Sequence, residues 1–339
     1  MAVIKDVANL AGVSISTVSK YFNNPNGLSE PYHSKVAAAV EELNFKPNAI
    51  ARGLRTKRTN TIALIVPDIT NTFYVEVYDS VRLAAISQGY MTQLYTTEEN
   101  FNMLNELVNQ LSSSKIDGMI LCFLDEDDTI TLLDRTQATV PVALLSWDSD
   151  TKFNSAVLDL TKTMYQATSY LIQRGHSKIA YVNGRAGSRI SFQKKGGYLK
   201  AMAGAGLTVP ENYIYSGNYS YRTGYQAAKQ FMQYPDPPTA IVAANDIIAI
   251  GCCKYLHLNG YRIPNDVSVV GMDGIQLAKI YDPSITTMAT PISAMGSEAV
   301  NLLINKINHP TSKNRQILFE SKLTVGRSTD ENAPLYLEF

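Results

Sequence analysis

The chain has 339 residues, of which 45% are hydrophobic and 18% charged, so a soluble protein of two or three folded units is expected. No apolar run approaches the roughly 20 residues of a membrane span. The N-terminus lacks the basic and apolar regions of a secretion signal, which predicts a cytoplasmic protein. The three cysteines and four histidines have no metal-ligand spacing, so no metal site is expected.

The formal net charge of zero conceals an asymmetry along the chain. Residues 1–60 contain eight Lys or Arg against four Asp or Glu, which leaves 22 basic and 26 acidic residues for the remainder. A small basic region attached to an acidic body indicates a surface that binds phosphate groups.

The first 45 residues have the pattern of three short helices. Apolar residues recur at helical spacing over 4–11, and Gly12 then permits the backbone to turn. Ser14 is a good N-cap for a second helix that continues to residue 22, and Ser29 is expected to cap a third helix that runs to about residue 43. Two helices joined by a short turn with Gly form a helix-turn-helix, a DNA-binding arrangement.

The N-terminal residues of the second helix of such a motif face base edges in the major groove. By position these are Ile15, Ser16 and Thr17, with Lys20 one turn further on. Isoleucine offers an apolar contact to a thymine methyl group, serine donates or accepts, and lysine reaches a guanine or a phosphate.

The stretch 4–14, followed by Thr17-Val18-Ser19, resembles the DNA-binding head of LacI/GalR-family repressors, and so does the stretch 42–52. The resemblance implies a hinge helix after residue 47 that orders on DNA and pairs with its dimer mate in the minor groove. There Ala51 would allow close approach and Leu54 would be an apolar wedge that bends the duplex. Taken alone, Leu54 would instead be interpreted as an ordinary core leucine.

Two departures from the family pattern concern the predicted DNA contacts. Lys20 stands where the family usually has arginine, so the bidentate fork is lost. Tyr32 and His33 replace a commoner Thr-Arg pair. The complete set of expected DNA-binding residues is Lys5, Ser14, Ile15, Ser16, Thr17, Ser19, Lys20, Asn23, Tyr32, Asn48, Ala51, Leu54 and Arg55.

From residue 61 onward, short apolar runs alternate with helical segments. Strands are expected at 62–66, 91–95, 119–123, 142–145, 179–182, 240–244 and 267–271, with a helix at 75–88. This alternation predicts α/β lobes built on doubly wound parallel sheets. The body also resembles the periplasmic sugar-binding fold that serves this family as effector domain. The expected division is a head at 1–46, a hinge at 47–60 and a body at 61–339, whose N-lobe takes about 61–160 plus 291–320 and whose C-lobe takes about 161–290 plus 321–332.

Parallel sheets bind ligands at the carboxyl ends of their strands. Asn71, Phe73 and Tyr74 follow the first strand of the body, and Asn245 and Asp273 follow strands of the second lobe. The resemblance implies that Tyr219 lies beside the ligand. It also shows two departures from the family pattern: Lys194 stands in place of an effector-clamping arginine, and Ser146-Trp147 stand in place of Asp-Arg. The complete set of expected effector-binding residues is Asn71, Phe73, Tyr74, Ser146, Trp147, Lys194, Tyr219, Asn245 and Asp273.

The sequence thus predicts a homodimeric transcriptional repressor of carbohydrate-utilisation genes that binds a palindromic operator. The absence of the arginine and the presence of the aromatic residues favour an uncharged sugar as effector. A nucleoside or a protein co-regulator is the alternative. Whether the effector acts as inducer or co-repressor is left open. A transport-type binding protein does not fit the basic head. An enzyme is not expected, because the chain has no dinucleotide fingerprint, phosphate-binding loop or nucleophile elbow, and no cofactor is expected.

Overall fold

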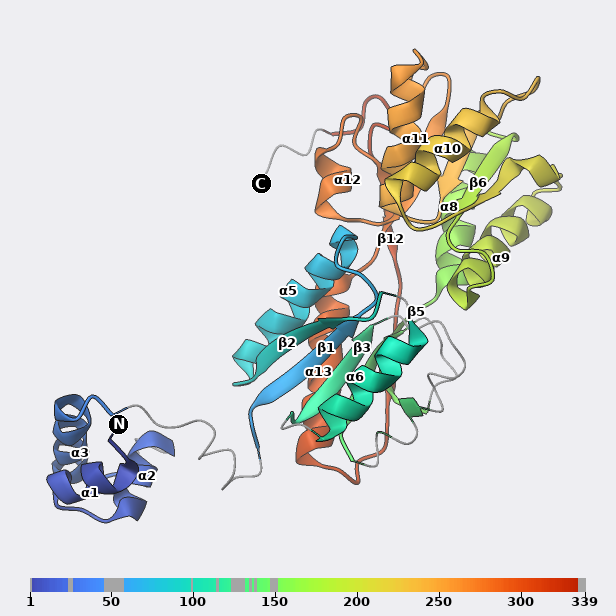
Figure 1. The fold of residues 1–339 in the computed structure, drawn as a ribbon. Helices are drawn as coiled ribbons and strands as arrows, with labels where there is room; N and C mark the ends of the chain where they lie inside the picture. The colour runs from blue at the N-terminus through green and yellow to red at the C-terminus, as the bar shows by residue number, and fades with distance from the viewer. Residues whose placement is uncertain are drawn as a thin grey trace. The chain divides into compact units, whose positions relative to one another are not determined.

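The computed structural model describes residues 2–23, 27–45, 58–98, 100–113, 116–122, 132–133, 136, 139–146 and 152–334. The chain forms two compact units, Met1–Asn60 and Thr61–Phe339, which we call the head and the body. Figure 1 shows the elements of each unit. The boundaries expected for the hinge and for the two lobes stay predictions.

The head contains the helices α1 (Ile4–Ala11), α2 (Ile15–Asn23) and α3 (Glu30–Glu42). Gly12 has a φ of 64° and ends α1, as its freedom at positive φ predicts. The Ser14 hydroxyl accepts a hydrogen bond from the N–H of Thr17 at 3.2 Å and so caps α2. Ser29 occupies the N-cap position of α3, but its side chain makes no cap hydrogen bond. The core is small and apolar, and consists of Val7, Ala8, Ala11, Val18, Val36 and Ala39.

The body is built on two sheets, and within the described residues each has six strands. The first sheet is parallel throughout, in the order β11 (Gln316–Phe319), β5 (Asn154–Leu158), β4 (Val142–Ser146), β3 (Gly118–Cys122), β1 (Thr61–Val66), β2 (Met91–Thr96). The second has the order β12 (Lys322–Thr324), β10 (Thr286–Ala289), β9 (Ser268–Asp273), β8 (Ala240–Ala243), β6 (Ile179–Asn183), β7 (Ile214–Ser216). The predicted fold class is confirmed, with one exception: β12 pairs antiparallel with β10.

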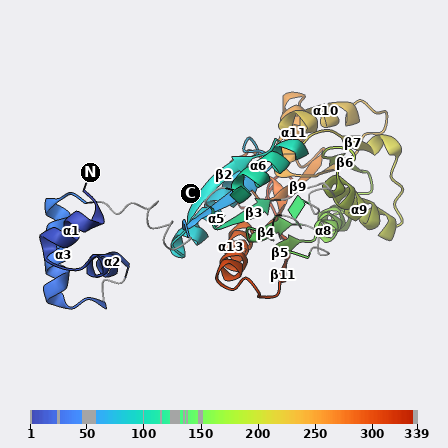
Figure 2. The same ribbon diagram turned by 60° about the horizontal axis from the view of Figure 1, so that its bottom comes forward.

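Helices cover both faces of each sheet (Figure 2). The first sheet carries α5 (Thr72–Ser87), α6 (Phe101–Ser113) and α13 (Ile292–Asn308). The second carries α8 (Leu160–Gln173), α9 (Arg189–Gly204), η2 (Glu211–Tyr213), α10 (Tyr221–Phe231), α11 (Asp246–Leu258) and α12 (Gln276–Ile280). Successive residues of β1 point to opposite faces of the sheet, and both faces are apolar, so each must be covered by helices. Leu64 belongs to the core cluster that contains α5 and α13, whereas Ile65 belongs to the cluster that contains α6.

We call the first sheet with its helices the N-lobe, and the second sheet with its helices the C-lobe. In the part of the chain that the structure describes, the backbone passes between the lobes at three places: from β5 to α8, from β10 to α13, and from β11 to β12. The cavity described below lies at the first two of these crossovers, because Leu158, Leu160 and Thr290 are among its lining residues.

None of the helices over the described ranges is long and apolar enough to span a membrane.

Candidate nucleic-acid interface and ligand cavity

The second helix of the head presents a row of polar side chains to solvent. Ser14, Ser16 and Lys20 are exposed, and Ile15 is 45% exposed beside them. The Ser14 hydroxyl lies 2.6 Å from that of Ser16 and 2.9 Å from that of Thr17, so the start of α2 is a cluster of hydroxyl groups that can donate or accept.

The other expected DNA contacts are distributed differently. Lys5 and Tyr32 are exposed, the latter at 50%, whereas Ser19 is only 9% exposed and belongs to the packed side of α2. The remaining predicted residues lie outside the described part of the chain, namely the Asn23 side chain and the hinge residues Asn48, Ala51, Leu54 and Arg55.

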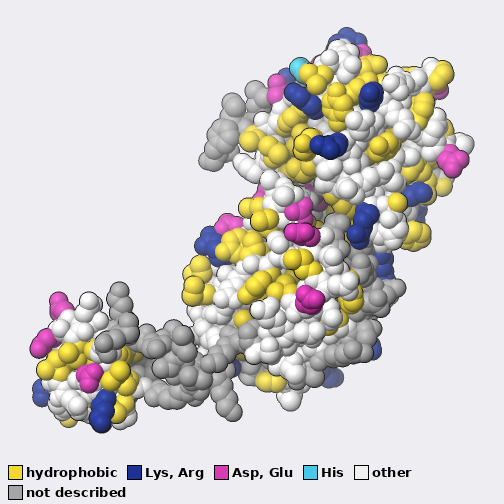
Figure 3. All heavy atoms as spheres, viewed as in Figure 1, with side chains coloured by type: hydrophobic (Ala, Val, Ile, Leu, Met, Phe, Trp, Pro, Cys, Tyr) yellow, Lys and Arg dark blue, Asp and Glu magenta, His cyan; other side chains and the backbone are white. Residues whose placement is uncertain are grey.

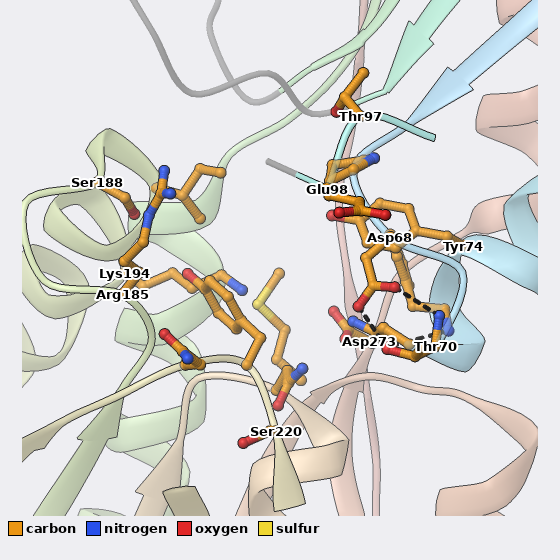
Figure 4. A pocket seen from close by; sticks show the side chains of 18 of the residues that line it. Asp68, Thr70, Tyr74, Thr97, Glu98, Arg185, Ser188, Lys194, Ser220 and Asp273 are labelled. Atoms are coloured by element: carbon orange, nitrogen blue, oxygen red, sulfur yellow. Dashed lines mark hydrogen bonds between the residues drawn. The ribbon is translucent and has the colours of Figure 1, made fainter. Parts of the chain in front are cut away.

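The body contains a cavity of about 600 Å³ at the carboxyl ends of strands from both sheets (Figure 4). Seven of the nine residues expected to contact an effector line it: Asn71, Phe73, Tyr74, Lys194, Tyr219, Asn245 and Asp273. Ser146 ends β4 without reaching the lining, and Trp147 lies outside the described residues. Positions chosen from the sequence alone therefore come together at one cavity.

The N-lobe wall of the cavity is formed by the turn between β1 and α5. The side-chain oxygen of Asn71 accepts from the N–H of Phe73 at 3.1 Å and caps α5, which leaves its amide group for other partners. Phe73 packs edge-to-face on Tyr74, with ring centroids 5.3 Å apart. Asp68 holds this turn by accepting from the backbone and hydroxyl of Thr70, at 2.8 and 2.6 Å.

On the C-lobe wall, Lys194 is a buried cation, with 5% of its surface exposed. Its Nζ donates to the carbonyl oxygen of Ala244 at 2.8 Å and lies 5.0 Å from the ring centroid of Tyr219. Burial lowers the pKa of Lys194, and the nearby carboxyls of Asp273 and Asp246 act in the opposite direction. The Tyr219 ring passes so close to Gly184 that a Cβ there would lie 2.1 Å from Cζ, so a larger residue at position 184 would displace the ring.

Unpaired polar groups collect at the floor of the cavity. Asn245 Oδ1 caps α11 by accepting from Ile248 N at 2.9 Å, but Asn245 Nδ2 is buried with no hydrogen-bond partner among the described residues. The Thr290 hydroxyl is in the same situation. The Asp273 carboxyl, 7% exposed, has no hydrogen bond with any side chain or backbone group in the described ranges.

Asp273 is also unusual in its backbone and its ionisation. Its φ of 119° is rare for a residue other than glycine and stores strain on the order of 1–3 kcal/mol. Burial raises its pKa to about 7; Lys194 opposes the rise and Glu76 adds to it. Its neighbour Asp246, whose pKa burial and Asp273 raise, accepts from the backbone N–H of Gly274 at 2.7 Å and of Ile275 at 3.0 Å.

Several residues that line the cavity were not predicted from the sequence, among them Arg185, Glu98, Phe101 and Thr290. Thr290 follows β10, a four-residue strand that apolar patterning alone does not reveal, since its sequence is TTMA. The signal that could have found it is its place just after Thr286-Thr287. Arg185 and Glu98 lie in loops, where sequence periodicity gives no position. Within the described ranges, no group of three or more His, Cys, Asp or Glu could hold a metal ion.

A helix-turn-helix head and a two-lobed body with a cavity lined by both polar and apolar side chains define a class of protein, the ligand-responsive DNA-binding regulators. Residues 3–48 match the family model of bacterial regulatory proteins, lacI family, and residues 59–325 match periplasmic binding proteins and sugar binding domain of LacI family. The chain belongs to the LacI family. It is a DNA-binding transcriptional regulator with an effector-binding body.

Individual relatives span nearly the whole chain. The HTH-type transcriptional repressor PurR of Vibrio atlanticus is 35% identical over 97% of this chain and 98% of its own. The ribose operon repressor of Escherichia coli K12 is 34% identical over 94% of this chain and 96% of its own. A crystal structure of the Lac repressor dimer bound to operator and the anti-inducer ONPF matches with a TM-score of 0.86 and 25% identity, over 97% of this chain and 99% of that one.

Proposed function

We propose that this protein is a homodimeric repressor that binds a palindromic operator and is controlled by a neutral sugar bound in the body cavity. It would act in the cytoplasm, where operator DNA lies. A sugar effector is supported by the set of unpaired polar groups on the cavity floor, namely Asn245 Nδ2, the Thr290 hydroxyl and the Asp273 carboxyl.

A polyhydroxylated ligand suits these three groups chemically. A buried polar group without a partner costs about 1–3 kcal/mol, which a ligand recovers by supplying that partner. Asn245 Nδ2 requires an acceptor, an ionised Asp273 requires donors, and Thr290 can do either. A sugar hydroxyl is both donor and acceptor, so adjacent hydroxyls of one sugar can satisfy all three.

The environment of Lys194 favours an uncharged ligand. Lys194 already donates to Ala244, and its burial lowers its pKa, so it is a weak anchor for a carboxylate or phosphate. The aromatic rings of Phe73, Tyr74 and Phe101 also line the cavity and offer apolar surface to the C–H groups of a sugar ring. The relative named ribose operon repressor supports this ligand class.

The proposed DNA contacts are those of the exposed start of α2, together with Lys5, Tyr32 and the hinge residues. Dimerisation is supported by exposed apolar side chains on α5 of the N-lobe. Val75, Leu83 and Ile86 are 49–55% exposed there, and Met91 at the start of β2 is 72% exposed. Figure 3 shows hydrophobic side chains over this part of the body. A second copy of the chain would cover them, as expected for a homodimer that reads two half-sites.

A thermal-shift screen of neutral mono- and disaccharides and of nucleosides tests the proposal, because a ligand of the native state raises the melting temperature. We expect a sugar to bind, Thr290→Val to weaken it, and Thr290→Ser to retain it. Asp236→Asn, on the exposed surface outside the cavity, is the control. Stabilisation by nucleosides alone would overturn the sugar class. A response to none of these compounds would favour a protein co-regulator.

A second experiment with the same sugar determines whether the effector is an inducer or a co-repressor. Operator affinity of the full chain, measured by fluorescence anisotropy with and without the sugar, falls for an inducer and rises for a co-repressor. Allosteric coupling is typically about 1–3 kcal/mol, or about 5- to 150-fold in affinity. Equal operator affinity in both conditions would refute effector control by that sugar.

A further inference from the structure

The turn after β9 is held by two carboxylates that come from different lobes. The N–H groups of Gly274 and Ile275 donate to Asp246 Oδ2, which belongs to α11 of the C-lobe. The next N–H, that of Gln276, donates to Glu76 Oε1 at 2.8 Å. Glu76 belongs to α5 of the N-lobe. This last hydrogen bond therefore joins the two lobes away from the three crossovers.

The Glu76 contact fills a specific need of α12. Gln276 is the first residue of this helix, and the N-cap residue, Ile275, has no side-chain group that could accept its N–H. The first amides of a helix need acceptors from outside the helix. Here the acceptor comes from the opposite lobe, so the bond is made only while α5 and α12 stay adjacent.

The same turn carries the group that is best placed to contact an effector. Asp273 lines the cavity and immediately precedes the three held amides, with its backbone at a φ of 119°. Its carbonyl oxygen accepts from Thr290 N at 2.9 Å, at the crossover between β10 and α13. Only three peptide units separate Asp273 from the interlobe hydrogen bond of Gln276.

We propose that Glu76 is a positioning residue that ties the two lobes together at the turn carrying Asp273, and so links effector binding to the arrangement of the lobes. The linkage rests on the proposed function, in which the effector contacts Asp273. The tie itself does not, because it is made by the protein alone.

Four variants separate the hydrogen bond from the charge of Glu76. Glu76→Ala removes both. Glu76→Gln removes the charge and keeps an acceptor. Gln276→Pro removes only the donor, since proline is favoured at the first position of a helix and the preceding residue has the extended ψ of 152° that proline requires. Gln276→Ala keeps the backbone N–H and is the matched control, because the Gln276 side chain is exposed.

The decisive measurement is the distance between the lobes in the full chain without effector. Spin labels on Glu106→Cys of α6 and Lys229→Cys of α10 report it by pulsed electron resonance, with excess unlabelled protein so that each dimer carries one labelled copy. The native cysteines are buried and do not take the label. We expect Glu76→Ala and Gln276→Pro to broaden the distance distribution, and Glu76→Gln and Gln276→Ala to leave it as in wild type. Four unchanged distributions would overturn the proposal.

A second measurement follows the charge. The groups that face Asp273 are Lys194 from α9, Asp246 from α11 and Glu76 from α5, and Asp68, Glu98 and Arg185 line the same cavity. Removing the Glu76 charge lowers the pKa of Asp273, so the pH dependence of the melting temperature moves to lower pH in Glu76→Gln and Glu76→Ala. It stays in place in Gln276→Pro, which a general loss of packing would not reproduce.

The third measurement tests the linkage, with ribose as the first probe and calorimetry as the method. Glu76→Ala and Gln276→Pro should change the ribose Kd by roughly 2- to 30-fold, and Gln276→Ala by less than about twofold. Equal Kd values in all variants would overturn the linkage. If wild type binds no sugar of the screen, the proposed function fails, whereas the distance measurement still decides whether Glu76 ties the lobes.

Discussion

Asp273→Asn should make the effector-free protein more stable above pH 7. The native carboxyl has a pKa raised from its ordinary 3.8 to about 7, mainly by burial. Between these values the unfolded chain binds fewer protons than the native protein, so stability falls as pH rises and the loss is complete above pH 7. A rise of that size corresponds to on the order of 4 kcal/mol. Asparagine resembles the protonated acid at every pH and also tolerates positive φ.

The assay is the melting temperature of wild type and Asp273→Asn from pH 5 to pH 9, without effector. At pH 5, roughly one unit above the ordinary pKa of 3.8, the variant should already melt somewhat higher, because about a third of the free-energy difference has developed by then. At pH 8 the variant should melt higher, by on the order of 10 °C if the full free energy is realised. Asp246 titrates in both proteins, and removing the Asp273 charge also lowers the pKa of Asp246, so the difference between the two proteins reports on the coupled pair. Parallel curves with no divergence would show that Asp273 does not hold its proton near neutral pH, and the reasoning would fail.

Three further predictions concern packing and DNA. Gly224→Ala should destabilise the body by about 3 kcal/mol or more, because its Cβ would lie 1.9 Å from the carbonyl oxygen of Ile248; urea denaturation measures this. Gly196→Ala is its control, since this glycine of α9 has no atom within 4 Å of the added Cβ, and alanine should stabilise the helix by about 0.5–1 kcal/mol; a similar loss in both would contradict the close-packing argument. Lys20→Ala should weaken operator binding. If Lys20 contacts a phosphate, the slope of log Kd against log salt concentration should fall by about 1. An unchanged slope with a relaxed sequence preference would instead show that Lys20 contacts a base. Leu54→Ala should lower operator affinity and reduce DNA bending in circular-permutation gels, and wild-type bending would remove it as the wedge.

The regular elements that carry clear periodicity could be predicted from the sequence. The turn at Gly12 and the cap at Ser14 are local chemistry, and both are present in the structure. The buried central strands β1, β3 and β8 are continuous apolar runs. Strand β7 could not be predicted in the same way, since it has only three residues and none of them is fully buried.

The candidate site divides along similar lines. Asn71 and Asn245 could be placed because each follows a recognisable strand and caps the helix that comes next. Glu76 could not, because its role depends on an amide 200 positions away in the chain. The same holds for the φ of Asp273, which the surrounding turn imposes and which no local pattern encodes.

The three crossovers have a consequence for how the protein is made. The N-lobe is completed by α13 and β11, and the C-lobe by β10 and β12, all of which lie after residue 285. Neither lobe can bury its sheet until this final segment has left the ribosome. The head, whose three helices contact one another within 45 residues, can fold as soon as it emerges. A chain that stops before residue 285 would therefore retain its folded head but have no body able to receive a signal.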